Sequence, residues 1–281
     1  MKFFENKRSH LFILFAMFVS SGLWGCGSMT QLNSNPLDRD IVVDGDYTEW
    51  GGQMWALDQE NIYIGTLNDD AFLYLSIVAS DRQTGMKMVM QGFTLWFDPD
   101  GGTDKVLGIR FPLGVGDEKK GPPSRPGEMS EPDSEQIKEQ FESSLTELEI
   151  FTKGNELPNR LLVADAHGVD VSASVESRSF VYELKIPLHR DETHPYGIGT
   201  KSGKLLSLKL ETPEIDVKEI RDKRDAMPGG GRGGRGGGGG GIPGDRRGGG
   251  PGGGSNMRPQ ASQPIDLWIK IQLASMDDII R

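Results

Sequence analysis

Hydrophobic and polar residues alternate with a period of two along most of the chain after residue 61. This alternation is typical of β-strands that bury one face and expose the other. Eight such runs stand out, at residues 62–67, 72–79, 93–97, 107–111, 169–175, 180–186, 206–210 and 267–273. Eight or more short strands with few helices predict an all-β fold, in which two antiparallel sheets pack face to face as an immunoglobulin-like or jelly-roll-like β-sandwich.

One stretch between these runs has the periodicity of a helix. Ile137, Phe141 and Leu145 recur at every fourth residue, and Asp133 or Ser134 can cap the first turn. The pattern predicts a short peripheral helix over an edge or an end of the sandwich.

Two stretches are poor candidates for a core. Residues 114–131 are rich in proline, glycine and charge, and residues 228–254 contain 18 glycines in 27 positions. Neither can repay the entropy of ordering, so both are predicted to be flexible loops. Because a strong strand pattern follows the second loop, the chain is predicted to form one sandwich domain at 41–275. A polar tether at 26–40 precedes this domain, and a short tail at 276–281 follows it.

The N-terminal segment has the layout of a bacterial export signal. Lys2, Lys7 and Arg8 precede an apolar stretch at 11–25, which is too short and too weakly flanked to be a stable membrane span. The stretch ends at Cys26, the only cysteine among the 281 residues.

Residues 23–26 (LWGC) resemble the bacterial lipobox, in which a small residue precedes a cysteine whose thiol takes a diacylglycerol. The resemblance implies a signal peptide at 1–25 and lipid attachment at Cys26, with acyl chains such as palmitate holding the protein to a membrane. Gly27 stands where many inner-membrane lipoproteins have aspartate, which implies the outer membrane, with the domain facing the periplasm or the cell surface. The alternative is an ordinary secretory signal with an incidental cysteine.

The charge of the chain excludes several partners. The net charge is −10, and removal of a leader with three basic residues and one acidic residue changes it to −12. An acidic chain has no general attraction for nucleic acid or for anionic lipid. Its arginine–glycine repeats at 228–254 are therefore interpreted as a spacer and not as an RNA-binding segment.

Four segments, in the same order, resemble the carbohydrate-binding module family 9-like, or DOMON-like, sandwich domains. They are 41–50 (IVVDGDYTEW), 68–75 (NDDAFLYL), 92–99 (GFTLWFDP) and 182–187 (YELKIP). The resemblance implies the sandwich fold over residues 40–274. It leaves the ligand open, because this sandwich serves sugar binding, haem binding and plain structural roles.

The tryptophans fall into two groups. Trp50 and Trp55 are predicted to be structural, with Trp50 plugging the end of the sandwich. Trp96 and Trp268 instead lie out of phase with the apolar residues of their own strands, so both indoles are predicted on an outer sheet face. Sugar rings stack their apolar faces on such aromatic platforms. The alternative is that an insertion or the helix covers both indoles.

The sequence Asp98-x-Asp100-Gly101-x-x-Asp104 offers three carboxylates. Calcium prefers hard oxygen ligands, so these side chains are a candidate calcium site. The loop lacks the distal glutamate of an EF-hand, and a plain hairpin turn is the alternative.

No catalytic motif is found: the chain has no G-x-S-x-G elbow and no H-E-x-x-H. The sequence therefore predicts non-catalytic binding of a polysaccharide or oligosaccharide at the cell envelope, as a free-standing protein or as an accessory module to glycoside hydrolases. One alternative is a haem-binding electron-transfer domain, with Met86, Met88 and Met90 as candidate axial ligands. Another is a structural or assembly partner in an envelope complex.

Overall fold

The computed structural model describes residues 29–57, 61–115, 134–176, 179–213 and 263–275. The leader, Cys26, the glycine-rich loop, the tail and all but the first two residues of the loop at 114–131 lie outside the described residues. No helix among the described residues is long and apolar enough to cross a membrane.

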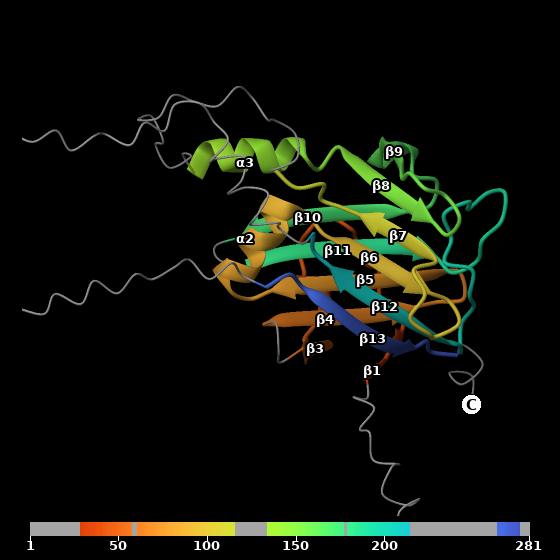
Figure 1. Cartoon of the computed structure of the whole chain (residues 1–281). Coiled ribbons are helices and arrows are strands. Elements are labelled where there is room, and N and C mark those ends of the chain that lie inside the picture. The colour runs from red at the N-terminus through yellow and green to blue at the C-terminus, as the bar shows by residue number, and fades with distance from the viewer. Residues whose placement is uncertain (1–28, 58–60, 116–133, 177–178, 214–262, 276–281) are drawn as a thin grey trace, which may run out of the picture.

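The described strands form two facing sheets, which confirms the predicted all-β sandwich (Figure 1). The seven-stranded sheet has the order β1-β13-β12-β6-β7-β8-β9. Its strands are β1 (Thr30–Asn33), β13 (Asp266–Gln272), β12 (Leu205–Glu211), β6 (Thr94–Asp98), β7 (Leu107–Arg110), β8 (Glu147–Thr152) and β9 (Asn159–Leu162).

The six-stranded sheet has the order β10-β11-β5-β4-β2, and β3 also pairs with β4. Its strands are β10 (Asp170–Glu176), β11 (Ser179–Pro187), β5 (Phe72–Ala79), β4 (Ile62–Asn68), β2 (Asn35–Pro36) and β3 (Met54–Leu57). The chain enters the seven-stranded sheet at β1 and crosses at once to the other sheet at β2.

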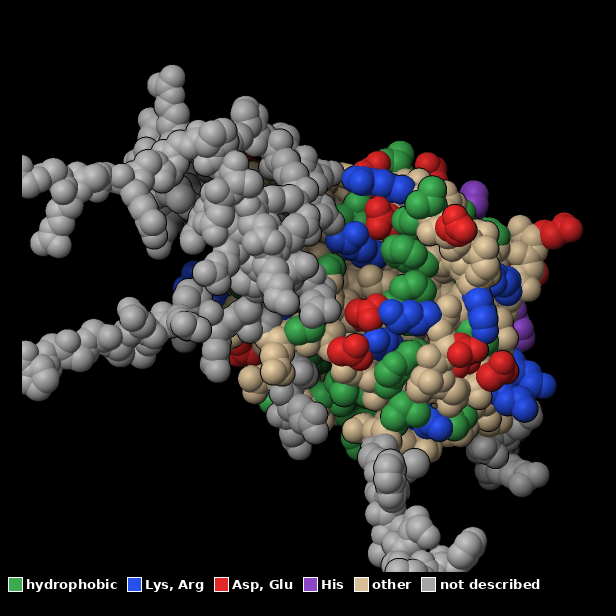
Figure 2. All heavy atoms as spheres, viewed as in Figure 1, with side chains coloured by type: hydrophobic (Ala, Val, Ile, Leu, Met, Phe, Trp, Pro, Cys, Tyr) green, Lys and Arg blue, Asp and Glu red, His purple; other side chains and the backbone are tan. Residues whose placement is uncertain are grey.

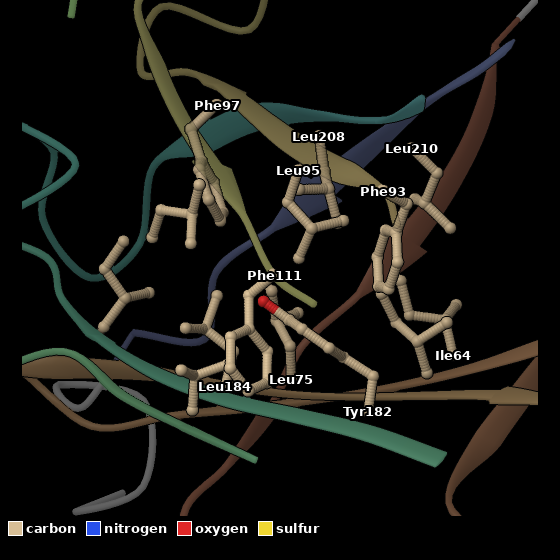
Figure 3. Close-up of a cluster of buried hydrophobic side chains, with 14 of the residues drawn as sticks. Ile64, Leu75, Phe93, Leu95, Phe97, Phe111, Tyr182, Leu184, Leu208 and Leu210 are labelled. Atoms are coloured by element: carbon tan, nitrogen blue, oxygen red, sulfur yellow. The ribbon is translucent and has the colours of Figure 1, made fainter. Parts of the chain in front are cut away.

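The alternating apolar residues meet between the two sheets. Figure 3 shows Leu95, Phe97, Leu208 and Leu210 from one sheet facing Ile64, Leu75, Tyr182 and Leu184 from the other, and all eight are buried. Apolar burial of this kind is the main stabilising term of the fold. Because these residues point inward, their neighbours in sequence on β6 and β12 point to the outer face.

Two helices lie beside the sheets. The predicted helix is present as α3 (Ser134–Ser143), and its Phe141 packs into the core. The other is α2 (Arg82–Gln91), which begins where Asp81 accepts hydrogen bonds from the backbone N–H groups of Gln83 and Thr84. Its Met88 is fully buried in the same core.

Two expectations are corrected. The predicted tether contributes strands, since β1 pairs in parallel with β13 and β2 pairs in parallel with β4. The sheets are therefore mixed and not purely antiparallel. Leu32 is the only apolar residue of the four-residue strand β1, and it packs into the core. A single apolar residue gives no periodic pattern, so the sequence did not predict this strand.

Candidate functional site on the outer face of the seven-stranded sheet

Trp96 and Trp268 lie in one row across three neighbouring strands. In the strand register Trp96 of β6 is paired with Lys209 of β12, and Lys209 is paired with Trp268 of β13. Paired residues of adjacent strands point to the same face, so both indoles stand on the outer face of this sheet. Both are partly exposed. The sequence predicted that both indoles lie on an outer face, but it did not predict that β6 and β13 are separated by only one strand.

The indole of Trp96 lies across the sheet. Its six-membered ring sits over Gly108 of β7, where a Cβ atom would come within 2.7 Å of the ring carbons. On the other side, its Nε1–H donates a 2.8 Å hydrogen bond to Glu211 Oε2 of β12. The side chain therefore spans from β7 to β12, and Gly108 supplies the space that this position requires.

Two aromatic and cationic contacts complete the surroundings of Trp96. The ring of Phe151, on β8, lies 5.2 Å from the indole, measured between centroids. Lys105 Nζ lies over the indole at 4.9 Å from its centroid and pairs with Glu211 at 2.6 Å. Because Lys105 is 42% exposed, this cation is held by weak, solvent-screened contacts.

A network of charged groups runs beside the row. Lys209 Nζ donates to Glu211 Oε1 at 2.8 Å and to Asp266 Oδ2 at 3.0 Å, and its own side chain is only 8% exposed. Burial alone would raise the pKa of Glu211, but the hydrogen bonds from Lys105, Lys209 and Trp96 together lower it. Glu211 is thus held as a carboxylate that accepts three donors.

A hollow of about 310 Å³ opens next to Trp96. Its lining combines two aromatic rings, several polar or charged side chains and the residues that flank the strand ends: Thr94, Trp96, Arg110, Phe151, Glu211, Thr212, Pro213, Pro264, Ile265 and Asp266. Figure 2, viewed from the side on which this sheet lies in front, shows hydrophobic side chains interspersed with acidic and basic ones. An aromatic wall with polar groups around it is the arrangement of many small-molecule sites.

The loop with the predicted calcium ligands is a tight hairpin. Asp98 is buried, and its two carboxylate oxygens accept the backbone N–H groups of Asp100 at 3.0 Å and of Asp104 at 2.8 Å. Asp104 in turn pairs with Lys153 at 2.7 Å. Among the described residues no group of three or more His, Cys, Asp or Glu side chains is placed to hold a metal ion. The structure therefore favours the hairpin turn over the calcium site.

Trp50 lies on the opposite side of the molecule, which corrects its predicted place at the end of the sandwich. It is buried over the outer face of the six-stranded sheet, against Leu67 and Tyr74. Its Nε1–H donates a 2.7 Å hydrogen bond to Glu183 Oε1 of β11. The structural role predicted for Trp50 is confirmed. For Trp55 that prediction is wrong, because its strand β3 is a short edge strand and leaves the side chain 44% exposed.

The three methionines of the haem alternative do not face one way. Met88 points into the core, whereas Met86 and Met90 are partly exposed on the other side of α2. Met88 therefore fills space in the core, as the flexible methionine side chain often does.

Several residues of the hollow were not among the site residues predicted from the sequence. Lys209 and Glu211 alternate with buried leucines on β12, so their phase marks them as outward-facing, as it did Trp96. Phe151 likewise alternates with buried Leu148 and Ile150, and Asp266 is in phase with Trp268, so both are also outward-facing. Their place beside Trp96 could not be predicted, because it depends on which strands are neighbours.

No protein-family model matches the chain, and no curated protein matches it in sequence. Solved structures similar to it include a family 9 carbohydrate-binding module from Caldicellulosiruptor kristjanssonii, in complexes with glucose and with cellotriose. These two are 11% and 12% identical, cover 67% and 68% of this chain and 81% and 79% of their own, and each has a TM-score of 0.32. A third is a protein from Bacteroides uniformis described as carbohydrate-binding, at 8% identity, with a TM-score of 0.35 and coverage of 66% of this chain and 84% of its own. The hollow beside Trp96 is assigned from the residues of this chain and not from these similar structures.

Proposed function

We propose that this protein binds carbohydrate in the hollow beside Trp96, without catalysis. The observation that carries the proposal is the position of this indole. It lies across an outer sheet face, above Gly108, and borders a hollow that also contains carboxylates and a guanidinium group. A pyranose ring presents an apolar C–H face and a rim of hydroxyl groups, and this pair of surfaces complements an aromatic ring beside polar side chains.

The polar side chains of the hollow suit hydroxyl groups. Asp266 is 62% exposed and bonded to Lys209 through one oxygen, so its carboxylate is accessible to a hydroxyl donor. Glu211 is fixed by three donors, so its position changes little when a ligand enters. Preorganised groups of this kind lower the entropic cost of binding.

A sugar stacked on the indole of Trp96 would displace Lys105. Its ammonium lies where a ring would stack on the indole. Moving it costs little, because exposed ion pairs and exposed cation–π contacts are each worth about 1 kcal/mol or less. Glu211 keeps Trp96 and Lys209 as partners after that movement.

The surroundings of Glu211 do not suit it to be the general acid of a glycosidase. A glycosidase needs a carboxylic acid whose pKa is raised, so that it carries a proton for the leaving group. The pKa of Glu211 is lowered, since Lys105, Lys209 and Trp96 all stabilise its charged form. It is suited to accept hydrogen bonds and not to donate a proton.

A glycan array probed with the purified protein tests this function. We expect retention on one or more neutral glycans, followed by saturable binding of the same glycan in calorimetry. Competition by the free glycan separates specific binding from adhesion to the array surface. Absence of binding to every neutral glycan on the array would contradict the proposal.

We also propose that the domain is carried on a lipid at Cys26, at the outer membrane. The single cysteine directly after a leader of the export type supports this proposal. In the native host, Cys26→Ser should abolish incorporation of labelled palmitate and leave an uncleaved or soluble precursor. Processing and membrane partition identical to those of the wild type would contradict it.

A further inference from the structure

The first strand of the domain begins close to the proposed lipid attachment. Only residues 27–29 stand between Cys26 and Thr30, where β1 begins, although the sequence predicted a tether over residues 26–40. Four residue spacings reach at most about 14 Å, whereas a tether of fifteen residues would reach about 50 Å. A lipid on Cys26 therefore keeps Thr30 within about 14 Å of its point of attachment.

One edge of the sandwich holds β1 together with β2 and β3. β1 is the edge strand of its sheet, and the single residue Ser34 joins it to β2 of the other sheet. Because β5 occupies one side of β4, β2 and β3 must pair along the other side, which is the edge. Figure 1 shows β1 and β3 at one margin of the sandwich and β9 at the opposite margin. We call the margin of β1, β2 and β3 the anchor edge.

The short connection decides which edge of the domain comes to the membrane. The sheet that contains β1 has seven strands, so β9 lies six strand spacings, or about 29 Å, away from β1. Thr30 is limited to about 14 Å from the lipid attachment. The anchor edge is therefore brought to the membrane surface, and the edge at β9 is held away from it.

The anchor edge exposes side chains that suit a membrane interface. Trp55 of β3 is 44% exposed, and its indole makes no hydrogen bond or ring contact within the described residues. Lys270 of β13 is partly exposed beside Gln31 of β1, and no ion pair holds it within the part of the chain that the structure describes. Indoles favour the headgroup level of a bilayer, and an ammonium group attracts the phosphates of the headgroups.

The other charges beside the edge strands do not supply an attraction of their own. Asp38 and Arg39 follow β2 and pair with each other at 2.7 Å, and Asp40 lies near Tyr74 of β5. Residues 58–60, which include two acidic side chains, lie outside the described residues. The net charge of the chain is −10, so electrostatic attraction to an anionic bilayer does not bring the domain to it. The contact depends on the lipid, which holds the edge at a high effective concentration.

We propose that the anchor edge lies on the phospholipid surface, with the indole of Trp55 at the level of the headgroups. This inference rests on the proposed lipid at Cys26 and adds the orientation of the domain. Because an edge faces the membrane, the two sheets stand upright on it. The hollow beside Trp96 then opens to the side, three strand spacings or about 14 Å from β1, where it stays accessible to a glycan.

Quenching of tryptophan emission by brominated lipids tests the contact. The lipidated protein is reconstituted into vesicles of phosphatidylethanolamine and phosphatidylglycerol with bromine on their acyl chains, which quenches only indoles close to the bilayer. Trp55→Phe should reduce the quenched part of the emission by at least about half, because this indole is the one at the interface. Trp96→Phe is the matched control: it removes a partly exposed indole three strands away and should leave the quenched part unchanged.

A spacer tests the short connection. About 20 Gly-Ser residues inserted after Ser28 lower the effective concentration of the edge at the membrane, so the quenched part should fall about twofold or more. Mass spectrometry of the same samples shows whether Cys26 carries a diacylglyceryl group. Lipidated protein whose quenching is unchanged by Trp55→Phe or by the spacer would overturn the orientation and leave the anchor in place. Protein without the lipid would instead contradict the proposed anchor, together with this inference.

Discussion

Replacement of Glu183 by glutamine isolates the carboxylate that fixes the N-terminal segment to the six-stranded sheet. Glu183 is fully buried; its Oε1 accepts the Trp50 Nε1–H at 2.7 Å, and its Oε2 accepts the backbone N–H groups of Asp44 at 3.1 Å and Gly45 at 2.9 Å. Glutamine has nearly the same shape but only one acceptor atom. Whichever way it turns, its amino group faces a donor.

The size of the effect follows from these three bonds. Hydrogen bonds to a charged group contribute about 1.5–3 kcal/mol, and a buried donor without an acceptor costs about 1–3 kcal/mol. One effect opposes this loss of stability. Burial raises the pKa of Glu183 because a buried charge is unfavourable, and the neutral glutamine does not carry that cost. We expect a net loss of about 2 kcal/mol in the free energy of unfolding, or about 4–8 °C in Tm for a domain of this size.

Thermal unfolding followed by circular dichroism at neutral pH measures this loss. Glu142→Gln is the matched control, because this carboxylate is 60% exposed on α3 and lies 3.8 Å from Lys138. The control should change the stability by less than about 0.5 kcal/mol. If Glu183→Gln melts within about 1 °C of the control, the buried carboxylate does not hold the segment and the reasoning fails.

Three further predictions concern other parts of the sandwich. Gly108→Ala should destabilise the fold by about 1–3 kcal/mol and weaken glycan binding, because the new Cβ displaces the Trp96 ring; unchanged melting and affinity would contradict the packing described. Glu211→Gln should be less stable than the wild type near neutral pH, and the gap should close in acid. The reason is that the lowered pKa of Glu211 contributes stability that is complete above pH 4.5 and is lost as the pH falls through the folded-state value; a gap that is constant with pH would refute it. Deletion of residues 228–254, with a short Gly-Ser linker in their place, should leave Tm unchanged or slightly raised. Thr212 and Ile265, on either side of the insertion, are already joined by a 3.0 Å backbone hydrogen bond, so a fall of several degrees would show that the deleted residues pack on the domain.

Most of the fold could be predicted from the alternation of apolar and polar residues along the sequence. It placed eight strands and the outward phase of Trp96 and Trp268, because burial on one face of a strand imposes a period of two. It did not find β1, a four-residue strand with one apolar side chain, since its place is set by backbone pairing with β13. Local patterns also cannot reveal parallel pairing, which joins segments far apart in sequence.

The candidate site was predictable only in part, for the same reason. Each tryptophan could be assigned to an outer face from its own strand. Their alignment through Lys209 required the strand order β6-β12-β13, which no local pattern encodes. In the structure both carboxylate oxygens of Asp98 accept backbone N–H groups of its own hairpin turn, which was the alternative to the calcium site. The spacing of Asp98, Asp100 and Asp104 in the sequence is the same for a calcium-binding loop and for a plain hairpin turn.

The measurement that bears most directly on sugar recognition at Trp96 is a calorimetric comparison of two tryptophan variants. Trp96→Ala removes a partly exposed indole from the outer face of the seven-stranded sheet. Trp55→Ala removes an exposed indole from edge strand β3 of the other sheet. Both should remain folded, as thermal melts of the same samples would verify. With the glycan selected on the array, Trp96→Ala should lose at least about tenfold in affinity, while Trp55→Ala should bind as the wild type does. Equal affinity of a folded Trp96→Ala variant and the wild type would contradict a sugar site at this indole.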